Sequence, residues 1–397
     1  MGVKQSDRLL LVLPIQAYSS EGRVFIDKQA CNGLRLWLEN FQNVTLACPV
    51  HHASPPRDRS PIDQVPGADR LNFISLPMAY KPHQFLGSLA KIAALLSNLI
   101  AISDYLHFGI GGLWGDWASV ACIIASRANR PFAIWTDRVE SKVALFQANS
   151  KTGVRRAYAE VTALLMKFYE RQIIRRSAIG LFHGMDCYSA YSGYCKNPHL
   201  VHDIHLSRED CITASELKIR IARTGPIRLV YAGRVHRDKG VFDWIEALSI
   251  ADVEFTAVWF GDGPALPMAR SRVDELGLSD RVKFPGSVES HSKLIRALKD
   301  FDAFVFCHKT PESPRCLVEA LMCGLPIIGY DSPYPRDLIR SYGGGLLTPI
   351  NEPRRVAESI PLFVQKRESL SISAFNDGRA FDTTEVFRHR SELMRSI

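Results

Sequence analysis

The sequence lacks the features that would place it at once among membrane-spanning, repetitive or low-complexity proteins. No run approaches the roughly 18 apolar residues that a membrane-spanning helix needs. The longest apolar stretch, residues 89–102, is interrupted by Lys91, Ser97 and Asn98. The first apolar run ends at Pro14, too early for a signal peptide with its cleavage site, so we expect a first strand there. No internal repeat is found.

Paired cysteines are also missing. The sequence has 9 cysteines, an odd number, and no Cys-x-x-Cys pair. Most lie in apolar contexts, as Cys48, Cys122 and Cys307 do. Buried, reduced thiols in a cytoplasmic protein are the simplest interpretation.

The bulk composition is that of a globular protein. The chain has 397 residues, of which 46% are hydrophobic and 23% charged, enough for two or three domains with real cores. The net charge of +8 favours anionic partners such as nucleotides, nucleic acid or an anionic membrane face. Nucleic acid is not expected, because the basic residues do not alternate with exposed aromatic ones and no nucleic-acid-binding motif is present.

Short apolar segments alternate with helical patterns along the first half of the chain. Such alternation favours an α/β fold with a parallel sheet covered on both faces. The expected strands are residues 9–13, 44–48, 72–76, 105–108 and 131–135, and the expected helices are residues 24–40, 85–101 and 117–128.

The second half repeats this alternation. We expect an N-terminal domain of residues 1–205, a second domain of residues 206–375 and a C-terminal helix in residues 376–397 that packs back on the first domain. The polar segment 203–226 is the expected linker. The expected strands are residues 228–232, 253–260, 282–284, 303–307 and 326–330, and the expected helices are residues 240–249, 265–276, 292–299 and 317–322.

Two stretches of the second domain resemble two halves of one anion site. In residues 229–240 an apolar strand runs into Gly233, Arg234 and, five residues on, Lys239. In residues 311–321 an acidic residue precedes the first turn of a helix that contains a second acid. Two fixed cations and a helix N-terminus suit a diphosphate, and two carboxylates suit sugar hydroxyls. Together they indicate a nucleotide-sugar.

The order and spacing of these motifs resemble the family-4, or group 1, glycosyltransferases. The resemblance is strong over residues 229–347, whereas the first half matches in layout only. It implies the GT-B architecture, in which two Rossmann-like domains face each other across a cleft. The motifs that carry it are Gly233-Arg234 with Lys239-Gly240, the glycine turn Phe260-Gly261-Asp262-Gly263-Pro264, the strand end Phe284-Pro285-Gly286, and the block Glu319–Ile328.

The resemblance also implies residue roles. Arg234 and Lys239 would neutralise the leaving diphosphate in place of a metal, Glu312 would hold the transferred sugar, and these three are the catalytic candidates. Glu319 would hold the ribose, and the backbone amides near Cys316 and Leu317 would add positive charge. Arg315 either pairs with Glu312 or reaches the phosphates. The donor-binding candidates are Gly233, Gly263, Arg315, Cys316, Leu317 and Glu319.

Three departures from the family pattern stand out. Glu312 and Glu319 have six residues between them, where the family has seven. The glycine-pair loop after the first strand is reduced to a segment with Gly22, and Asp137 stands where many members have a histidine. His107 and Asp116 flank a glycine-rich loop that is either an acceptor contact or a plain βα connection. The acceptor-side candidates are therefore Gly22, His107, Asp116 and Asp137.

No metal or other cofactor is expected. His199, His202 and His205 are three residues apart, which fits one helical face only loosely, and no zinc-hydrolase motif accompanies them. A linker with scattered histidines is the preferred interpretation. We also expect no Asp-x-Asp pair, which could bind a metal ion, in the cleft of either domain.

Residues 151–177 form a basic amphipathic pattern. An apolar stripe contains Val161, Leu164 and Phe168, and basic residues recur every four positions. Such a helix either lies on an anionic membrane, which suits a lipid-linked acceptor, or packs on the first domain.

The sequence thus predicts a cytoplasmic, metal-independent, retaining glycosyltransferase, with a peripheral place on the inner membrane face as a further expectation. It would move a hexosyl-type sugar from a nucleoside-diphosphate donor to a glycan or lipid-linked acceptor in cell-surface polysaccharide synthesis. Two alternatives stay open: a sugar-nucleotide epimerase or phosphorylase of the same architecture, and a catalytically silent nucleotide-sugar or glycan-binding protein.

Overall fold

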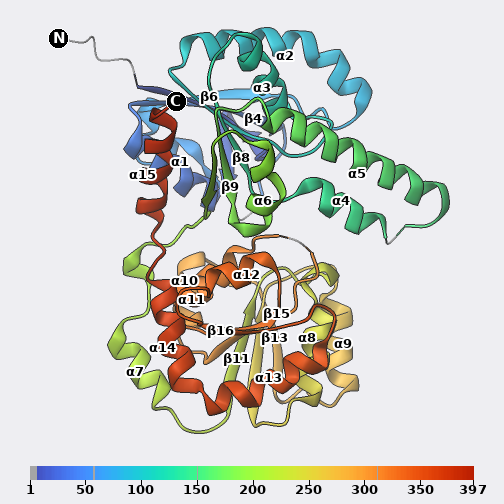
Figure 1. The fold of residues 1–397 in the computed structure, drawn as a ribbon, viewed down its shortest axis with the longest axis vertical. Coiled ribbons are helices and arrows are strands. Elements are labelled where there is room, and N and C mark those ends of the chain that lie inside the picture. Colours follow the sequence, from blue (N-terminus) through green and yellow to red (C-terminus); the bar gives the residue numbers. More distant parts are fainter. Residues whose placement is uncertain (1–6, 57–58, 150, 311) are drawn as a thin grey trace. The chain divides into compact units, whose positions relative to one another are not determined.

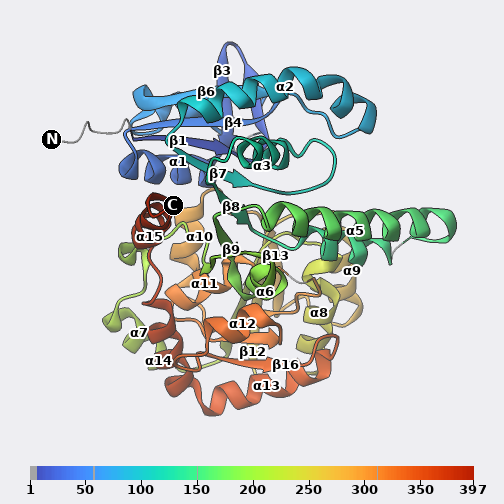
Figure 2. The same ribbon diagram turned by 45° about the horizontal axis from the view of Figure 1, so that its top comes forward.

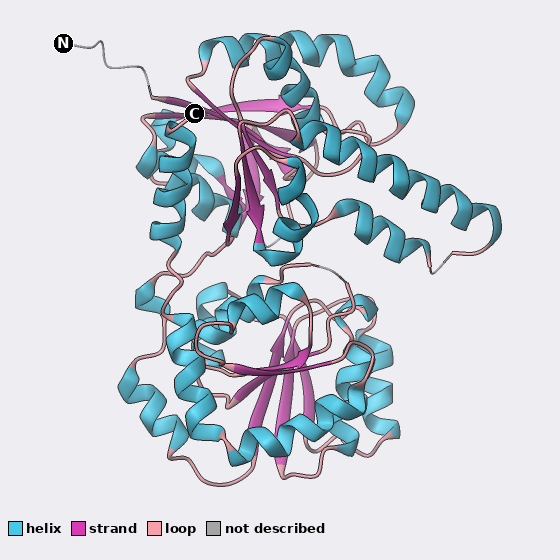
Figure 3. Ribbon diagram, in the orientation of Figure 1, coloured by secondary structure: helices cyan, strands magenta, loops and turns pink. Residues whose placement is uncertain are grey.

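A computed structural model describes residues 7–56, 59–149, 151–310 and 312–397. The chain forms two compact units (Figure 1). The first unit is Met1–His205 together with Thr384–Ile397, and the second is Leu206–Thr383. In Figure 3 each unit has its own sheet with helices around it, so the predicted α/β class is confirmed.

The first unit is built on a largely parallel sheet. Its seven central strands follow the order β6-β4-β1-β7-β8-β9-β10, so successive strands extend first to one side of β1 and then to the other. This is the doubly wound pattern of Rossmann folds. The strands are β1 (Arg8–Val12), β4 (Asn43–His51), β6 (Leu71–Leu76), β7 (Tyr105–Gly109), β8 (Ala133–Thr136), β9 (Ile179–His183) and β10 (Pro198–Val201).

A β-hairpin extends this sheet and corrects one prediction. Residues 24–40 were expected to be one helix, but β2 (Ala17–Ser20) and β3 (Arg23–Asp27) pair in antiparallel fashion and β5 (Arg59–Pro61) adds to them. Helix α1 (Lys28–Asn40) begins only after Asp27, whose carboxylate accepts from Gln29 N at 2.8 Å. Valine, phenylalanine and isoleucine before that cap favour the strand.

Both faces of the first sheet are buried. Along β1, Leu10 and Val12 belong to one apolar cluster and Leu9 and Leu11 to another, because successive side chains of a strand point to opposite faces. The helices are α1, α2 (Pro82–Ile102), α3 (Trp117–Arg127), α4 (Glu140–Ala148), α5 (Gly153–Ile174), α6 (Gly184–Tyr191) and α15 (Thr383–Arg395).

Helix α2 is long and apolar enough to cross a membrane by length and composition, and it is the only such helix in the described part of the chain. No such helix was expected from the sequence, because Lys91, Ser97 and Asn98 interrupt its apolar run. The side chains of Phe85, Leu96 and Ile100 nevertheless pack in the core of the first unit. That packing is also typical of a core helix in a globular domain.

Helix α15 returns from the second unit to complete the first. Phe387 and Met394 lie in the same apolar cluster as Leu9 and Leu46. The guanidinium of Arg390 lies 4.1 Å from the ring centroid of Trp135. The first unit is therefore assembled from both ends of the chain.

The second unit has a six-stranded, fully parallel sheet. Its order, β13-β12-β11-β14-β15-β16, is the Rossmann order with β11 as the first strand. The strands are β11 (Ile227–Ala232), β12 (Phe255–Phe260), β13 (Val282–Gly286), β14 (Ala303–Phe306), β15 (Ile327–Tyr330) and β16 (Gly345–Thr348).

The expected linker of residues 203–226 contains a helix that the sequence analysis missed. Helix α7 (Ala214–Ile221) begins after Thr213, whose side chain accepts from Glu216 N at 3.2 Å, and the Glu216 carboxylate accepts from Thr213 N at 2.7 Å. This capping box was readable as Thr-x-x-Glu. The other helices are α8 (Val241–Ile250), α9 (Leu266–Glu275), α10 (His291–Leu298), α11 (Arg315–Met322), α12 (Pro333–Leu338), α13 (Pro353–Gln365) and α14 (Arg367–Gly378).

All nine cysteines are free thiols, as the sequence predicts. Burial raises the pKa of Cys48 to about 12, which keeps this thiol protonated at ordinary pH.

A buried aspartate fastens the N-terminal edge of the second sheet. Asp302 is 2% exposed and accepts from Arg228 N at 2.8 Å and from Arg367 Nη2 at 2.7 Å. The Asp302→Ala change should lower the free energy of unfolding by about 3 kcal/mol, because it leaves the largely buried guanidinium of Arg367 without its carboxylate. Urea denaturation measures this. Asp300→Ala, two residues away and exposed, is the matched control and should cost less than about 0.5 kcal/mol. Equal losses in the two variants would refute the assignment.

Candidate donor site at the strand ends of the second unit

The strand order of the second unit creates one place where two neighbouring strands lead in opposite directions. From β11 the chain proceeds towards β12 and β13, and from β14 it proceeds towards β15 and β16, although β11 and β14 are paired. Ligands of open α/β sheets bind at the carboxyl ends of strands at such a switch point. The segments that follow these two strands, residues 233–240 and 307–314, contain the predicted catalytic residues.

Gly240 brings these two segments into contact. Its φ is +69°, and a Cβ at this position would lie 1.9 Å from the carbonyl oxygen of Cys307. Only glycine fits both the left-handed backbone and the close approach. The 3-10 helix η5 (Arg237–Lys239) ends at Gly240, and α8 starts directly after it.

The predicted Lys239 and Glu312 meet. Lys239 Nζ lies 2.5 Å from Glu312 Oε1, and Thr310 Oγ1 donates to the same oxygen at 2.8 Å. Both charged side chains are largely buried. Burial favours the neutral acid, but Lys239, His308 and the hydrogen bond from Thr310 together outweigh it, and the pKa of Glu312 lies below its ordinary value. The pair is therefore ionised at neutral pH.

Arg234 stands apart from this pair. Its side chain is exposed, and it forms no ion pair with any residue that the structure describes. Gly233 before it is fixed from both sides, because its amide donates to Phe260 O and its carbonyl accepts from Trp259 Nε1, each at 2.9 Å. The loop thus carries the unpaired Arg234 and the paired Lys239 on a fixed backbone.

Gly263 closes the same region from the β12 side. A Cβ there would lie 2.4 Å from the carbonyl oxygen of Val235. The amide of Gly263 donates to Asp262 Oδ1 at 2.6 Å, and Val235 N donates to Asp262 O at 2.9 Å. The turn of residues 261–264 therefore packs against the loop of Arg234 without room for a larger residue.

A buried tyrosine and histidine lie beneath the Lys239–Glu312 pair, and sequence reasoning missed both. Tyr231 Oη and His308 Nε2 are 2.6 Å apart. Burial, with a further contribution from Lys239, lowers the pKa of His308 to about 3, so its ring is neutral at ordinary pH. Neither residue belongs to a motif, and only the pairing of β11 with β14 reveals that they meet.

Helix α11 starts at Arg315, with Pro314 as its N-cap. The sequence analysis expected the amides of both Cys316 and Leu317 to serve an anion. The amide of Leu317 instead donates to Pro314 O at 3.2 Å, so it is used within the first turn. Arg315 and Cys316 are half-buried at the helix start. Pro311 lies outside the described residues.

Glu319 is held by a partner that the sequence did not reveal. It is 7% exposed, and its Oε1 lies 2.9 Å from His291 Nε2, at the first position of α10. The hydrogen bond to Glu319 raises the pKa of His291 above its ordinary value, against the opposing effect of burial. The carboxylate is thus oriented from a neighbouring helix.

Two of the acceptor-side candidates, Gly22 and His107, occupy positions that the fold itself explains. Gly22 is exposed at the tip of the β2–β3 hairpin, where Glu21 and Gly22 both have positive φ, as two-residue hairpin turns require. His107 is 1% exposed within β7, with its ring centroid 5.3 Å from that of Trp37 and its Nε2 3.4 Å from Arg390 Nη2. The buried His107 side chain is thus not available to an acceptor as placed, whereas a role for the exposed Gly22 stays a prediction.

The other two acceptor-side candidates differ from each other. Asp116 caps α3 by accepting from Ser119 N at 3.0 Å, and burial raises the pKa of Asp116 to about 6. It also accepts from Gly111 N at 3.4 Å, which fixes the glycine-rich loop. Asp137 is exposed directly after β8. Of the four candidates, Asp137 alone presents a free-standing charged side chain at a strand end.

Metal ligands do not gather in the described part of the chain, where no group of three or more His, Cys, Asp and Glu side chains could hold an ion. An Asp-x-Asp sequence does occur as residues 300–302, but it precedes β14. It therefore lies at the strand's amino end, opposite the switch point.

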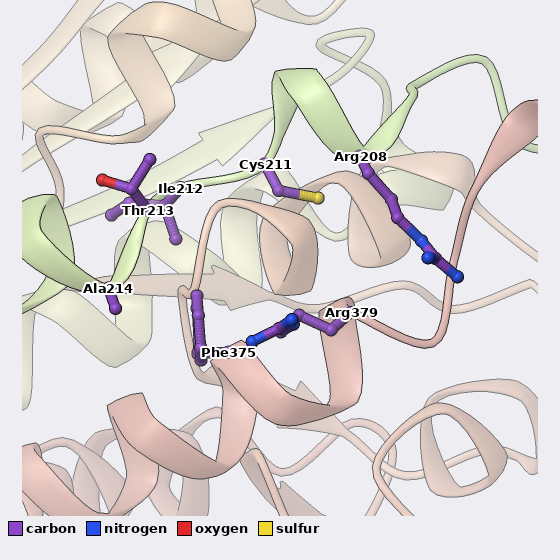
Figure 4. A pocket seen from close by; sticks show the side chains of 7 residues that line it. All are labelled: Arg208, Cys211, Ile212, Thr213, Ala214, Phe375 and Arg379. Carbon is purple, nitrogen blue, oxygen red and sulfur yellow. The ribbon is translucent and has the colours of Figure 1, made fainter.

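A separate hollow of about 390 Å³ lies elsewhere in the second unit (Figure 4). It is open beside α7 and the end of α14, and the predicted donor residues take no part in it. Its lining residues are Arg208, Cys211, Ile212, Thr213, Ala214, Phe375 and Arg379.

Comparison with known proteins identifies the second unit. Residues 215–373 match the family model described as "Glycosyl transferases group 1". The second unit is a group 1 glycosyltransferase domain. Over the whole chain, the crystal structure of Anabaena Alr3699/HepE in complex with UDP superposes with a TM-score of 0.71 at 16% identity, covering 98% of this chain and 100% of that one. This likeness confirms the predicted GT-B type of fold, with its two parallel-sheet domains.

Curated relatives match part of the chain. A putative colanic acid biosynthesis glycosyltransferase, WcaL of Escherichia coli, is 25% identical over 244 residues, which are 52% of this chain and 59% of the relative. The 2-deoxystreptamine N-acetyl-D-glucosaminyltransferase of Streptomyces fradiae is 32% identical over 30% of this chain and 29% of the relative. The chain thus matches less than two thirds of the length of either relative.

The His291–Glu319 pair in the group 1 domain predicts a pH-dependent contribution to stability. Because the folded-state pKa of His291 is raised, the pair stabilises fully below the unfolded-state pKa near 6.5 and loses this effect as pH rises through the folded value. His291→Gln should therefore cost about 1 kcal/mol or less at pH 6 and almost nothing at pH 9. Denaturant titration at both pH values checks this. A cost that does not change with pH would contradict the ion pair.

Proposed function

We propose that the protein is a retaining glycosyltransferase that moves a hexosyl-type sugar from a nucleoside-diphosphate donor to a glycan or lipid-linked acceptor. The observation that carries this proposal is the position of Arg234, Lys239 and Glu312 at the switch point of a group 1 domain. Two cations and a carboxylate at the carboxyl ends of parallel strands suit a diphosphate linked to a sugar.

The Lys239–Glu312 pair gives this mechanism a first step. A diphosphate brought between Arg234 and Lys239 offers Lys239 a doubly charged partner in place of one carboxylate. Glu312 is then released towards the hydroxyls of the sugar, which carboxylate oxygens accept well. As the bond from sugar to phosphate breaks, the two cations stabilise the growing negative charge on the leaving diphosphate. Glu319, oriented by His291, is assigned to the ribose.

Retention of the anomeric configuration follows from the family resemblance. In this proposal no metal takes part, because Arg234 and Lys239 supply the charge that a divalent cation provides in other transferases. Asp137 is the acceptor-side residue that stands exposed at a strand end.

For the biological setting we infer cell-surface polysaccharide synthesis at the cytoplasmic face of a membrane. The name of the E. coli relative, a colanic acid biosynthesis glycosyltransferase, supports this setting. The exposed apolar stripe of α5, which includes Val161, Leu164 and Phe168, supports a peripheral membrane position.

A catalytically silent nucleotide-sugar-binding protein is the second candidate. Two observations favour it: the spacing of Glu312 and Glu319 is one residue short, and Lys239 already has a carboxylate partner. Incubation with UDP-, GDP-, ADP- and dTDP-sugars separates the two functions. A transferase should be stabilised by one donor and release its nucleoside diphosphate, whereas a silent protein would show only the stabilisation.

The donor-site assignment predicts that Arg234→Ala and Lys239→Ala each weaken donor binding while the fold stays intact. Loss of one charge-assisted contact to phosphate costs about 1.5–3 kcal/mol, which is roughly a 10- to 150-fold increase in Kd. Isothermal titration with the stabilising donor measures it. Lys293→Ala, which removes an exposed lysine of the same unit, is the matched control and should bind normally. Donor affinity like that of the unmodified protein in either site variant would reject the assignment.

Metal independence gives a separate prediction. Donor turnover should continue in excess EDTA, because Arg234 and Lys239 are covalently part of the chain. Release of nucleoside diphosphate, followed with and without chelator, checks this. If EDTA abolished turnover and added Mg²⁺ or Mn²⁺ restored it, the two-cation mechanism would be wrong.

A further inference from the structure

A cavity of about 550 Å³ lies at the base of the α4–α5 hairpin in the first unit. It belongs to the first unit alone, whereas the sequence motifs of the donor site all belong to the second unit. Figures 1 and 2 show α5 projecting well beyond the sheet, with α4 beside it and α6 near its base. The volume lies within the range of small-molecule sites.

The walls of this cavity are mostly apolar. Leu145 of α4, Ala163 and Leu164 of α5, and Ala190 and Tyr194 beyond them contribute to it. Leu164 is 63% exposed although it is a leucine. Exposed apolar side chains that border a cavity are typical of a binding site for hydrocarbon.

One lining residue, Glu170, has a carboxylate whose hydrogen bonds are already made within the protein. Glu170 is 4% exposed and accepts from Ser141 N at 3.0 Å, Ser141 Oγ at 2.7 Å and Tyr191 Oη at 2.9 Å. Burial raises the pKa of Glu170. Because its oxygens are already bonded, it does not call for a cationic guest.

Three basic side chains also line the cavity. Lys142, Lys167 and Arg171 line it, and none of them forms an ion pair with a residue that the structure describes. The guanidinium of Arg171 is held 4.5 Å from the ring centroid of Tyr194. Three unpaired positive charges beside apolar walls complement a molecule with an anionic head and a hydrocarbon tail.

The apolar surface continues from the cavity along α5. Leu164 belongs to both the cavity and the exposed stripe, and Val161, Leu165 and Phe168 extend it. A hydrocarbon chain longer than the cavity would therefore find further apolar contact outside it.

We propose that this cavity binds one lipid phosphate, with its hydrocarbon chain against Leu145, Leu164 and Tyr194 and its phosphate on Lys142, Lys167 and Arg171. This rests on the proposed function, since such a lipid would carry the acceptor glycan. The cavity would then hold the acceptor by its anchor, and the rest of the stripe would lie along the lipid.

Geranylgeranyl phosphate, below its aggregation concentration, is the probe. It should bind with one-to-one stoichiometry, whereas geranylgeraniol, which has no phosphate, and inorganic phosphate, which has no chain, should each bind at least about tenfold more weakly. The double variant Lys142→Gln, Lys167→Gln should lose about tenfold or more in affinity for the probe. Both lysines are exposed, so the change should leave the fold intact.

The matched control is Lys151→Gln, Arg155→Gln, which removes the same charge from the outer end of the hairpin. Both residues are exposed and lie outside the cavity. The control should bind the probe as the unmodified protein does. Equal loss in both double variants would show attraction to a charged surface only, and would overturn the cavity proposal. No binding of the probe, or equal binding of inorganic phosphate, would overturn it as well.

Donor stabilisation and release of nucleoside diphosphate, measured on the same variants, separate this proposal from the proposed function. Intact donor turnover with no lipid binding would reject the cavity alone. Lipid binding without any donor turnover would leave the cavity in place and reject the transferase. Binding only to anionic vesicles, equally weakened in both double variants, would assign the hairpin to a bilayer surface instead.

Discussion

The pairing of β11 with β14 is the constraint on which the donor site depends. Parallel strands 74 residues apart in register, Leu229 with Ala303, have carboxyl ends that meet at one edge of the sheet. The loops that follow must then share a small space, and the contact between Gly240 and Cys307 shows how little of it remains. Lys239 and Glu312 are brought together by this topology rather than by any local sequence feature.

Before a donor binds, the charges at the carboxyl ends of β11 and β14 are partly balanced. Lys239 is neutralised by Glu312, and Arg234 is left to face solvent. A donor therefore meets one available cation first and gains the second by displacing a carboxylate. Beneath them, the neutral Tyr231–His308 pair adds no charge of its own.

The sequence predicted the parts of the fold that local pattern controls. Strong strands such as β11 and β14, and the glycine that ends β11, were readable because apolar runs and turn residues act over a few positions. The β2–β3 hairpin was missed because Glu21-Gly22 is a weak turn signal and Val24–Ile26 continues an apolar pattern into α1. Helix α7 was missed although Thr213 and Glu216 form a readable cap. At the site, motifs identified Lys239, Glu312 and Glu319, but their partners His291 and His308 depend on tertiary contacts. His107 and Asp116 were chosen because they flank a glycine-rich loop. In the structure both side chains are buried, and Asp116 caps α3.

Helix α15 has a consequence for how the chain is made. Phe387, Arg390 and Met394 fill the core of a unit whose other residues end at His205. During synthesis these side chains leave the ribosome only after the residues of the second unit. The first unit must therefore wait, with an apolar face uncovered, while the second unit has all its residues and can fold. Order of assembly is thus the reverse of order in sequence, and a chain that stopped before α15 would lack part of the core of its first unit.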